Sequence, residues 1–201
     1  MPSYSNLTAL SSHLFIVGAI MLTPTSAAAG QYEGRVIVEW VEHDGSDRLV
    51  KLIEPFSYID DNGKAWRVPA GALVDGASIP RVLWTTVGSP FVGDYRYATV
   101  IHDYYCDQKT ETWQNTHRVF YDAMLTSGVS RIKAAKMYAA VRAFGPRWAR
   151  LSTTGLGGVD QLVYDVDPPG ISDERLEEVF DKIENEGLDL DEIDQFVDSS
   201  T

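Results

Sequence analysis

The chain of 201 residues has a single cysteine, Cys106, and few basic residues: 17 Lys and Arg stand against 29 Asp and Glu, a formal net charge of −12. One cysteine excludes an intramolecular disulfide framework and any zinc module built from several cysteines. The shortage of positive charge argues against nucleic acid as a partner, because no net positive field is available to neutralise phosphates. The hydrophobic content of 44% nevertheless suffices for a folded core.

Long hydrophobic stretches are also scarce. One apolar run, Leu14–Leu22, is only nine residues long, too short to span a bilayer comfortably. The small residues Ala27–Ala29 follow it, which is typical of a secretory signal peptide cleaved near Gly30. We therefore predict a signal peptide over residues 1–29, a secreted or periplasmic protein, and no transmembrane span in the mature chain. A buried N-terminal helix is the alternative.

The negative charge is concentrated at the C-terminus. Residues 165–201 contain 14 acidic and 2 basic residues, so they account for the whole net charge. The helix-incompatible stretch Asp167–Gly170 precedes an N-cap signal at Ser172 and an amphipathic helical pattern. This pattern predicts an acidic helical appendage over residues 165–201, for which the sequence identifies no partner. The globular domain is then expected over residues 30–164.

The period of the apolar residues changes within that domain. Three segments rich in β-formers predict strands: Tyr32–Glu42, Arg48–Ile59 and Ala65–Val68. The second strand is expected to be broken or bulged near Pro55, and a tight-turn signal over residues 60–63 separates it from the third. Helical spacing then runs over residues 93–106, from Trp113 to Met124, and from Ser130 to Gly145. The sequence therefore predicts an α+β fold with a small N-terminal antiparallel sheet, a three-helix core and an acidic helical tail.

Two histidines lie within the apolar patterns of consecutive predicted helices. His102 and its neighbour Asp103 lie on the first helix, and His117 lies on the apolar stripe of the second. If the helices pack antiparallel, the two imidazoles can face each other. Together with a carboxylate they would form either a metal site or a general base with its orienting partner. We take His102, Asp103 and His117 as the candidate catalytic group, and a buried structural role is the alternative.

Two further residues can join this group. Asp75 lies in a turn-like Asp-Gly-Ala-Ser segment ending at Ser78, and we add Asp75 to His102, Asp103 and His117 as a candidate metal ligand. Cys106 follows His102 by four residues and shares its helix face, so a thiol–imidazole nucleophile is one interpretation. A small buried hydrophobe is the other interpretation of Cys106.

The order of several short motifs resembles a known family. These motifs begin at Val74–Arg81 and Trp84 and continue through Ile101–Tyr104, Phe120–Met124 and Tyr138–Arg142. Over roughly Trp66 to Trp148 the chain resembles the family called domain of unknown function 1353. The family name implies no activity. Its members often have an Ala-Asp pair where this chain has Thr116-His117, so a role for that aspartate does not transfer unchanged.

A more distant likeness is to secreted phospholipases A2 of the compact microbial type. In that family a histidine activates water and the adjacent aspartate binds calcium, so the resemblance implies these roles for His102 and Asp103. His117 occupies the position of the orienting carboxylate, and the usual disulfides are absent. An imidazole at that position shifts the expected metal from calcium toward zinc.

Two functions of different classes follow. The first is a hydrolase with the candidate group described above, acting on a small-molecule or lipid ester substrate through water polarised by a metal or by imidazole. The second is a noncatalytic binding or assembly protein in which the same residues form a structural polar network. The cofactor is left open between zinc, calcium and none.

Overall fold

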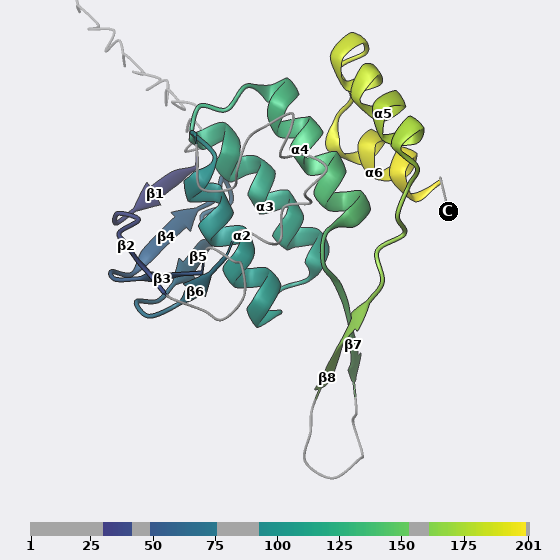
Figure 1. Cartoon of the computed structure of the whole chain (residues 1–201). Coiled ribbons are helices and arrows are strands. Elements are labelled where there is room, and N and C mark those ends of the chain that lie inside the picture. The colour runs from purple at the N-terminus through teal and green to yellow at the C-terminus, as the bar shows by residue number, and fades with distance from the viewer. Residues whose placement is uncertain (1–29, 42–48, 76–92, 153–160, 200–201) are drawn as a thin grey trace, which may run out of the picture.

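The computed structural model describes residues 30–41, 49–75, 93–152 and 161–199. The predicted signal peptide and Ser78 lie outside these residues. Within the described part, small sheets lie on one side of a layer of helices, and two C-terminal helices cover the other side (Figure 1). This arrangement confirms the predicted α+β class. Among the described helices, none has the length and apolar character needed to cross a membrane.

Six short strands form two antiparallel sheets of three strands each, with the orders β1–β4–β5 and β2–β3–β6. Buried residues alternate with exposed ones along β3 and β5, which is the pattern of strands with one face on a core. Helix α2 packs against β5 and β6. The strand bounds are Gln31–Glu33 (β1), Val38–Trp40 (β2), Val50–Leu52 (β3), Phe56–Ile59 (β4), Ala65–Val68 (β5) and Leu73–Val74 (β6).

The strand predictions were right in kind and too long in extent. The predicted strand Tyr32–Glu42 is two strands, β1 and β2, that belong to different sheets. The second predicted strand is broken near Pro55 into β3 and β4, as predicted from the sequence, because proline cannot donate to a strand ladder. The tight turn after β4 is held by Asp60, whose Oδ1 accepts hydrogen bonds from the backbone N–H groups of Asn62 and Lys64, each at 3.0 Å.

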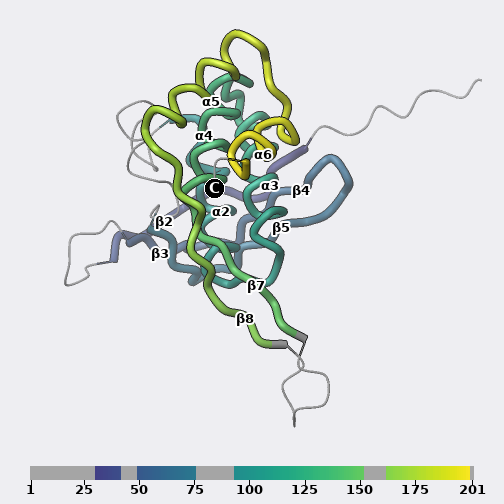
Figure 2. The backbone as a smooth tube through the Cα atoms, turned by 90° about the vertical axis from the view of Figure 1, so that its right-hand side faces the viewer, coloured from purple at the N-terminus to yellow at the C-terminus, as the bar shows by residue number. Residues whose placement is uncertain are grey.

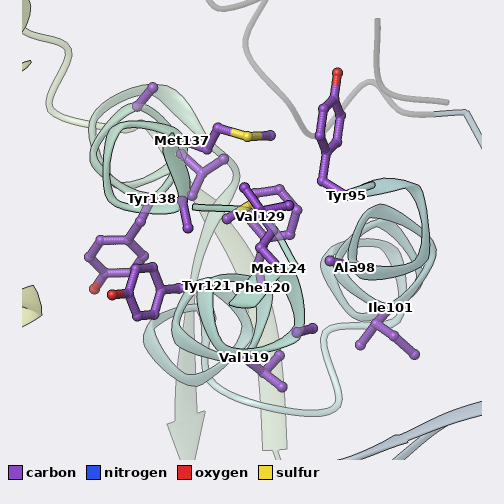
Figure 3. Close-up of a cluster of buried hydrophobic side chains, with 14 of the residues drawn as sticks. Tyr95, Ala98, Ile101, Val119, Phe120, Tyr121, Met124, Val129, Met137 and Tyr138 are labelled. Carbon is purple, nitrogen blue, oxygen red and sulfur yellow. The ribbon is translucent and has the colours of Figure 1, made fainter. Parts of the chain in front are cut away.

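Three consecutive helices form the centre of the molecule: α2 (Arg96–Gln108), α3 (Trp113–Thr126) and α4 (Arg131–Phe144). Thr112 and Ser130 cap α3 and α4, each accepting a hydrogen bond from a backbone N–H three residues on. Helix α3 packs between α2 and α4. Figure 3 shows the core between them, where Phe120, Met124 and Met137 lie fully buried.

Two acidic helices, α5 (Asp173–Asn185) and α6 (Leu190–Asp198), pack on α4. Ser172 caps α5 and Asp189 forms a capping box on α6. Their apolar stripes belong to the same buried cluster as the central helices, while their acidic faces point to solvent. The buried residues are Leu176, Val179, Phe180, Ile183, Ile193 and Val197.

A hairpin of two strands, β7 (Arg147–Ser152) and β8 (Gln161–Val166), extends beyond the helices (Figure 1 and Figure 2). No strand was predicted here from the sequence. Its base is fixed to the loop after α2 by side chains of β7. Trp148 donates from Nε1 to the Glu111 carbonyl at 2.8 Å, and Arg150 donates to the Lys109 carbonyl at 2.5 Å and to the Glu111 carbonyl at 2.9 Å.

Candidate functional site

The two predicted histidines meet at the interface of α2 and α3. The Nε2 atom of His102 lies 2.9 Å from the Nδ1 atom of His117, so one ring donates a hydrogen bond and the other accepts it. Both residues have no exposed surface. The ring of Phe120 packs 4.6 Å from the His102 ring, and Trp113 packs 5.5 Å from the His117 ring. The helix-pair geometry expected from the sequence is therefore present.

Cys106 lies next to the two histidines and adds a third potential metal ligand. Its Sγ atom lies 3.6 Å from Nε2 of His102, one helical turn away on the same face of α2. One nitrogen from each histidine and the cysteine sulfur all lie within 4.8 Å of one another. The ligand set predicted from the sequence omitted Cys106, although its spacing of four from His102 was visible in the sequence.

Burial keeps both imidazoles neutral. It lowers the pKa of His102 to about 3, because charging a ring inside the core would remove an ion from water. Burial also lowers the pKa of His117 well below its usual value, and the positive charges of Arg147 and Arg142 act in the same direction. A neutral imidazole is the form that binds metal ions, whereas a ring so reluctant to take a proton is a poor general base.

The residues packed around His117 restrict the rotation of its ring. The guanidinium carbons of Arg142 and Arg147 lie 4.4 and 4.2 Å from the centroid of the Trp113 ring, and Trp113 in turn contacts His117. On another side a Cβ atom at Gly145 would lie 3.2 Å from Cε1 of His117. The His117 ring therefore has little room to rotate, which is the requirement for a preorganised ligand.

A cavity of about 510 Å³ opens beside this cluster. Cys106 lines this cavity, whereas His102 and His117 do not. Asp103 and Asp75 line the same cavity, so the two carboxylates proposed from the sequence face one space. Asp103 is 5% exposed on α2, and Asp75 directly follows β6, which pairs with β3. The remaining described lining residues are Leu49, Leu73, Val74, Asp107, Lys109, Pro146 and Asp165.

The end of α2 shapes the rim of the cavity. Lys109 takes a left-handed conformation with φ of 51° and ends the helix, its N–H bonded to the Tyr105 carbonyl. Its Nζ atom then pairs with Oδ1 of Asp165 on β8 at 2.5 Å. The hairpin base therefore forms part of the cavity wall, a contribution that the sequence analysis did not anticipate.

The donor set discriminates between the two metals expected from the sequence. Tetrahedral zinc with bonds of about 2.0–2.1 Å to nitrogen and about 2.3 Å to sulfur places N–N pairs ~3.3 Å and N–S pairs ~3.6 Å apart. The observed separations are 2.9 Å between the histidines and 3.6 Å between His102 and Cys106. Calcium requires six to eight oxygen ligands, and two imidazoles with a thiol do not supply them. Two imidazoles and a thiol are donor types that zinc prefers and calcium does not.

Comparison with known proteins finds one family model that matches the central part of the chain. Residues 50–141 match the family model described as "Protein of unknown function (DUF1353)", which confirms the resemblance drawn from the sequence motifs. The match contains His102, Cys106 and His117. The description of the family names no activity.

Two similar proteins come from Sinorhizobium fredii. The uncharacterized protein y4iH is 50% identical over 108 residues, which cover 54% of this chain and 44% of that protein. The uncharacterized protein y4jT is 50% identical over 100 residues, which cover 50% of this chain and 30% of that protein. The chain thus spans less than half the length of either relative. No solved structure gives a significant match.

Proposed function

From the premise that this chain carries a DUF1353 region, we propose that it is a metal-dependent hydrolase whose centre is formed by His102, Cys106 and His117. The observation that carries the proposal is the convergence of these three donors within 4.8 Å at the wall of a cavity. Three protein ligands with a fourth position left open distinguish catalytic zinc sites from structural ones, which are closed by four. The cavity at Cys106 provides the space for that fourth ligand.

In this proposal the carboxylates of the cavity handle the proton. A metal ion held by the three donors would supply a Lewis acid that lowers the pKa of water. Asp103, one residue after a ligand and facing the cavity, takes a proton from water as the water oxygen attacks the carbonyl carbon of the substrate. The bond from that carbon to the leaving group breaks, and the proton passes to the leaving group. Asp75 faces the same space and orients the water or substrate.

The three donors can be tested by substituting cobalt for zinc. Co²⁺ bound to a thiolate gives a near-ultraviolet charge-transfer band that is absent without sulfur ligation. We expect one equivalent of Co²⁺ and this band in the full-length protein, no band in Cys106→Ser, and weaker binding in His117→Ala. Absence of stoichiometric binding would overturn the proposal.

Turnover is tested on the zinc-loaded protein with a panel of p-nitrophenyl esters. Asp103→Asn should retain zinc stoichiometry and lose at least tenfold in kcat, since only proton transfer is removed. Asp181→Asn, the same change at an exposed position on α5, is the matched control and should leave kcat unchanged. Metal binding without turnover on any ester of the panel would limit the site to a structural or binding role.

A noncatalytic protein is the second candidate, and one observation favours it: both histidines are completely buried and bonded to each other. A buried hydrogen-bonded pair stabilises a helix interface without any chemistry. Substitution of His102 does not separate the two functions, because it leaves the Nδ1 atom of His117 without its partner in either case. Cys106→Ser separates them, since it removes a metal ligand at the cavity wall and leaves the histidine pair intact.

Export is the proposed location. The pattern of residues 14–29 supports cleavage near Gly30, and the first described strand begins at Gln31. Expression of the full chain in a bacterial host, followed by fractionation and mass spectrometry of the N-terminus, tests this point. A cytoplasmic protein that retains residues 1–29 would contradict it.

A further inference from the structure

The end of the acidic appendage is linked to the start of α3, where Trp113 contacts His117. Asp198 is the last residue of α6, and its carboxylate pairs with two arginines. Its Oδ2 atom accepts a hydrogen bond from Nη2 of Arg142, and its Oδ1 atom lies 3.5 Å from Nη2 of Arg147. Arg142 belongs to α4 and Arg147 begins β7, so one carboxylate of the appendage joins two other elements.

The same two arginines contact the ring of Trp113. The guanidinium carbon lies 4.4 Å from the ring centroid in Arg142 and 4.2 Å in Arg147, distances at which a cation is attracted to the face of an indole ring. Trp113 begins α3 one helical turn before His117, and the two ring centroids are 5.5 Å apart with the planes inclined by 62°. The arginines therefore restrict the Trp113 ring, and this ring restricts His117.

Two guanidinium groups on one ring need a negative charge between them. The side chains of Arg142 and Arg147 are only 8% and 13% exposed, so their mutual repulsion is weakly screened by water and salt. Burial and the charge of Arg142 lower the pKa of Arg147, whereas Asp198 acts in the opposite direction. Loss of the Asp198 charge should therefore loosen the guanidinium group of Arg147 and the Trp113 ring beneath it.

We propose that Asp198 is a positioning residue for His117 and thereby sets the metal affinity of the centre. It acts through the two arginines and the Trp113 ring. The inference deepens the proposed hydrolase and rests on its metal centre. A metal ion binds more tightly to a ligand that is already oriented, because less side-chain freedom is lost on binding. Asp198 lies outside residues 50–141, so the acidic appendage, and not the region matched by the family model, supplies this contact.

Titration of the full-length protein with Co²⁺ measures the effect of Asp198. Direct partners of metal ligands typically contribute about tenfold or more to metal affinity, and Asp198 is further removed. We therefore expect Asp198→Asn to bind Co²⁺ about threefold to tenfold more weakly than the parent chain. The substitution should leave α6 packed, because the Asp198 side chain is 46% exposed while Ile193 and Val197 are fully buried, and urea unfolding checks this point.

Two variants serve as controls for the titration. Asp198→Glu keeps the charge and should bind Co²⁺ within about twofold of the parent chain. Asp191→Asn makes the same charge change on the same helix, at a carboxylate that is 76% exposed and pairs with Arg118, so it should also stay within about twofold. Equal Co²⁺ affinities of Asp198→Asn and Asp191→Asn would overturn the inference.

Arg147→Gln separates positioning from a simple effect of charge. Besides burial, the charge of Arg147 lowers the pKa of His117, so a pure charge effect predicts stronger Co²⁺ binding when this charge is removed. Positioning predicts about threefold weaker binding, because Trp113 loses one of its two cations. The double variant with Asp198→Asn should bind no more weakly than the weaker single variant, since both changes break the same set of contacts. Stronger binding in Arg147→Gln would overturn the inference.

NMR of the metal-free protein, labelled with ¹⁵N at its four histidines, separates this inference from the proposed function. Positioning predicts that Asp198→Asn shifts or broadens the ring signals of His117 and that Asp191→Asn does not. If the parent chain binds no Co²⁺ but these signals respond, Asp198 still positions His117 and the hydrolase is removed. If the parent chain binds Co²⁺ and neither its affinity nor the signals respond to Asp198→Asn, the inference is overturned and the hydrolase stands.

Discussion

Nε2 of His102 lies 2.9 Å from Nδ1 of His117 across the interface of α2 and α3. The two residues are fifteen positions apart, and the short loop between the helices turns the chain so that both rings point into one core. Because the contact is fully buried, its geometry is set by helix packing and not by solvent. Cys106 extends the pair toward the cavity, and among the described residues this is the one group of three His, Cys, Asp or Glu side chains close enough to hold a metal ion.

The single cysteine gives a direct test of the centre. Cys106 lies at the cavity wall and is the only thiol in the chain, so alkylation by iodoacetamide reports on this one site. We expect slow modification of the metal-free protein and at least tenfold slower modification after addition of one equivalent of Zn²⁺, because coordination withdraws electron density from the sulfur and hinders the approach of the reagent. Intact-mass spectrometry over time measures both rates. Equal rates with and without zinc contradict metal ligation by Cys106.

Gly145 is predicted to be intolerant of any side chain. Its φ of −74° is ordinary, but a Cβ atom there would lie 2.4 Å from the Val141 carbonyl oxygen and 3.2 Å from Cε1 of His117. Gly145→Ala should lower the free energy of unfolding by about 2–3 kcal/mol through overpacking, and should weaken cobalt binding by displacing the His117 ring. Urea denaturation and cobalt titration measure the two effects.

Gly71→Ala is the control for that experiment. Gly71 has φ of +86° and open space around its Cβ position, so alanine costs roughly 1 kcal/mol of backbone strain without touching the histidines. It should lower stability and leave the cobalt spectrum unchanged. If both glycine variants alter cobalt binding equally, the effect at Gly145 is general destabilisation and not displacement of His117.

Asp194 is predicted to be the main polar anchor of α6. Its carboxylate accepts from the Tyr138 hydroxyl and from Arg118, each at 2.6 Å, and lies 3.3 Å from Nε of the buried Arg142. Asp194→Ala should cost about 1–3 kcal/mol, because it leaves the buried Tyr138 hydroxyl without its acceptor and removes one of the two carboxylates that pair with Arg142, the other being Asp198. The neighbouring Asp191 pairs with the same Arg118 but is 76% exposed, so Asp191→Ala should cost less than about 1 kcal/mol. Urea unfolding of the two variants measures the difference, and equal costs would show that the α6 contact is purely apolar.

Sequence periodicity was sufficient for the helices and for the His102–His117 contact. Helix α3 is marked by apolar residues at helical spacing and by a Thr cap, and only a short loop joins it to α2. Few ways of packing the two helices remain, so the sequence could predict that the rings of His102 and His117 face each other. Cys106 was left out of the predicted ligand set because a lone cysteine is usually a core residue. Its position beside His102 and at the cavity wall depends on tertiary packing, which the sequence does not reveal.

The strands were harder to place. β1 and β2 are contiguous in a β-rich run, yet they pair with different strands, and no local signal reveals which partner each chooses. The β7–β8 hairpin was missed because its stability depends on distant contacts, namely Trp148 and Arg150 on the carbonyls of the loop after α2. Such contacts join residues about forty positions apart and leave no periodic pattern. The contact between Lys109 and Asp165 at the cavity was missed for the same reason.

Asp122 is predicted to make the stability of the protein decrease as the pH rises from about 4 to about 6. The pKa of its carboxyl is raised to about 6, mainly by burial and also by the nearby charges of Asp61 and Asp60, while Arg118 lowers it. The folded state therefore holds the proton more tightly than the unfolded chain, whose aspartates titrate near pH 4. The stabilisation that this proton provides is complete below about pH 4 and is lost as the pH rises through 6.

Asp122→Asn places a neutral side chain at this position at every pH, so the difference in stability from the parent chain measures the cost of ionising Asp122. At pH 7.5 the variant should be more stable than the parent chain by about 1–2 kcal/mol, a figure reduced for solvent screening of a partly exposed group, and at pH 4 the two should be equal. Thermal or urea unfolding across this range measures the gap. Asp181→Asn, at an exposed acid on α5, should show no such pH-dependent gap. A gap that widens toward acid would mean that the Asp122 carboxylate is stabilised by a positive partner, which is the opposite of the environment described by Asp60 and Asp61.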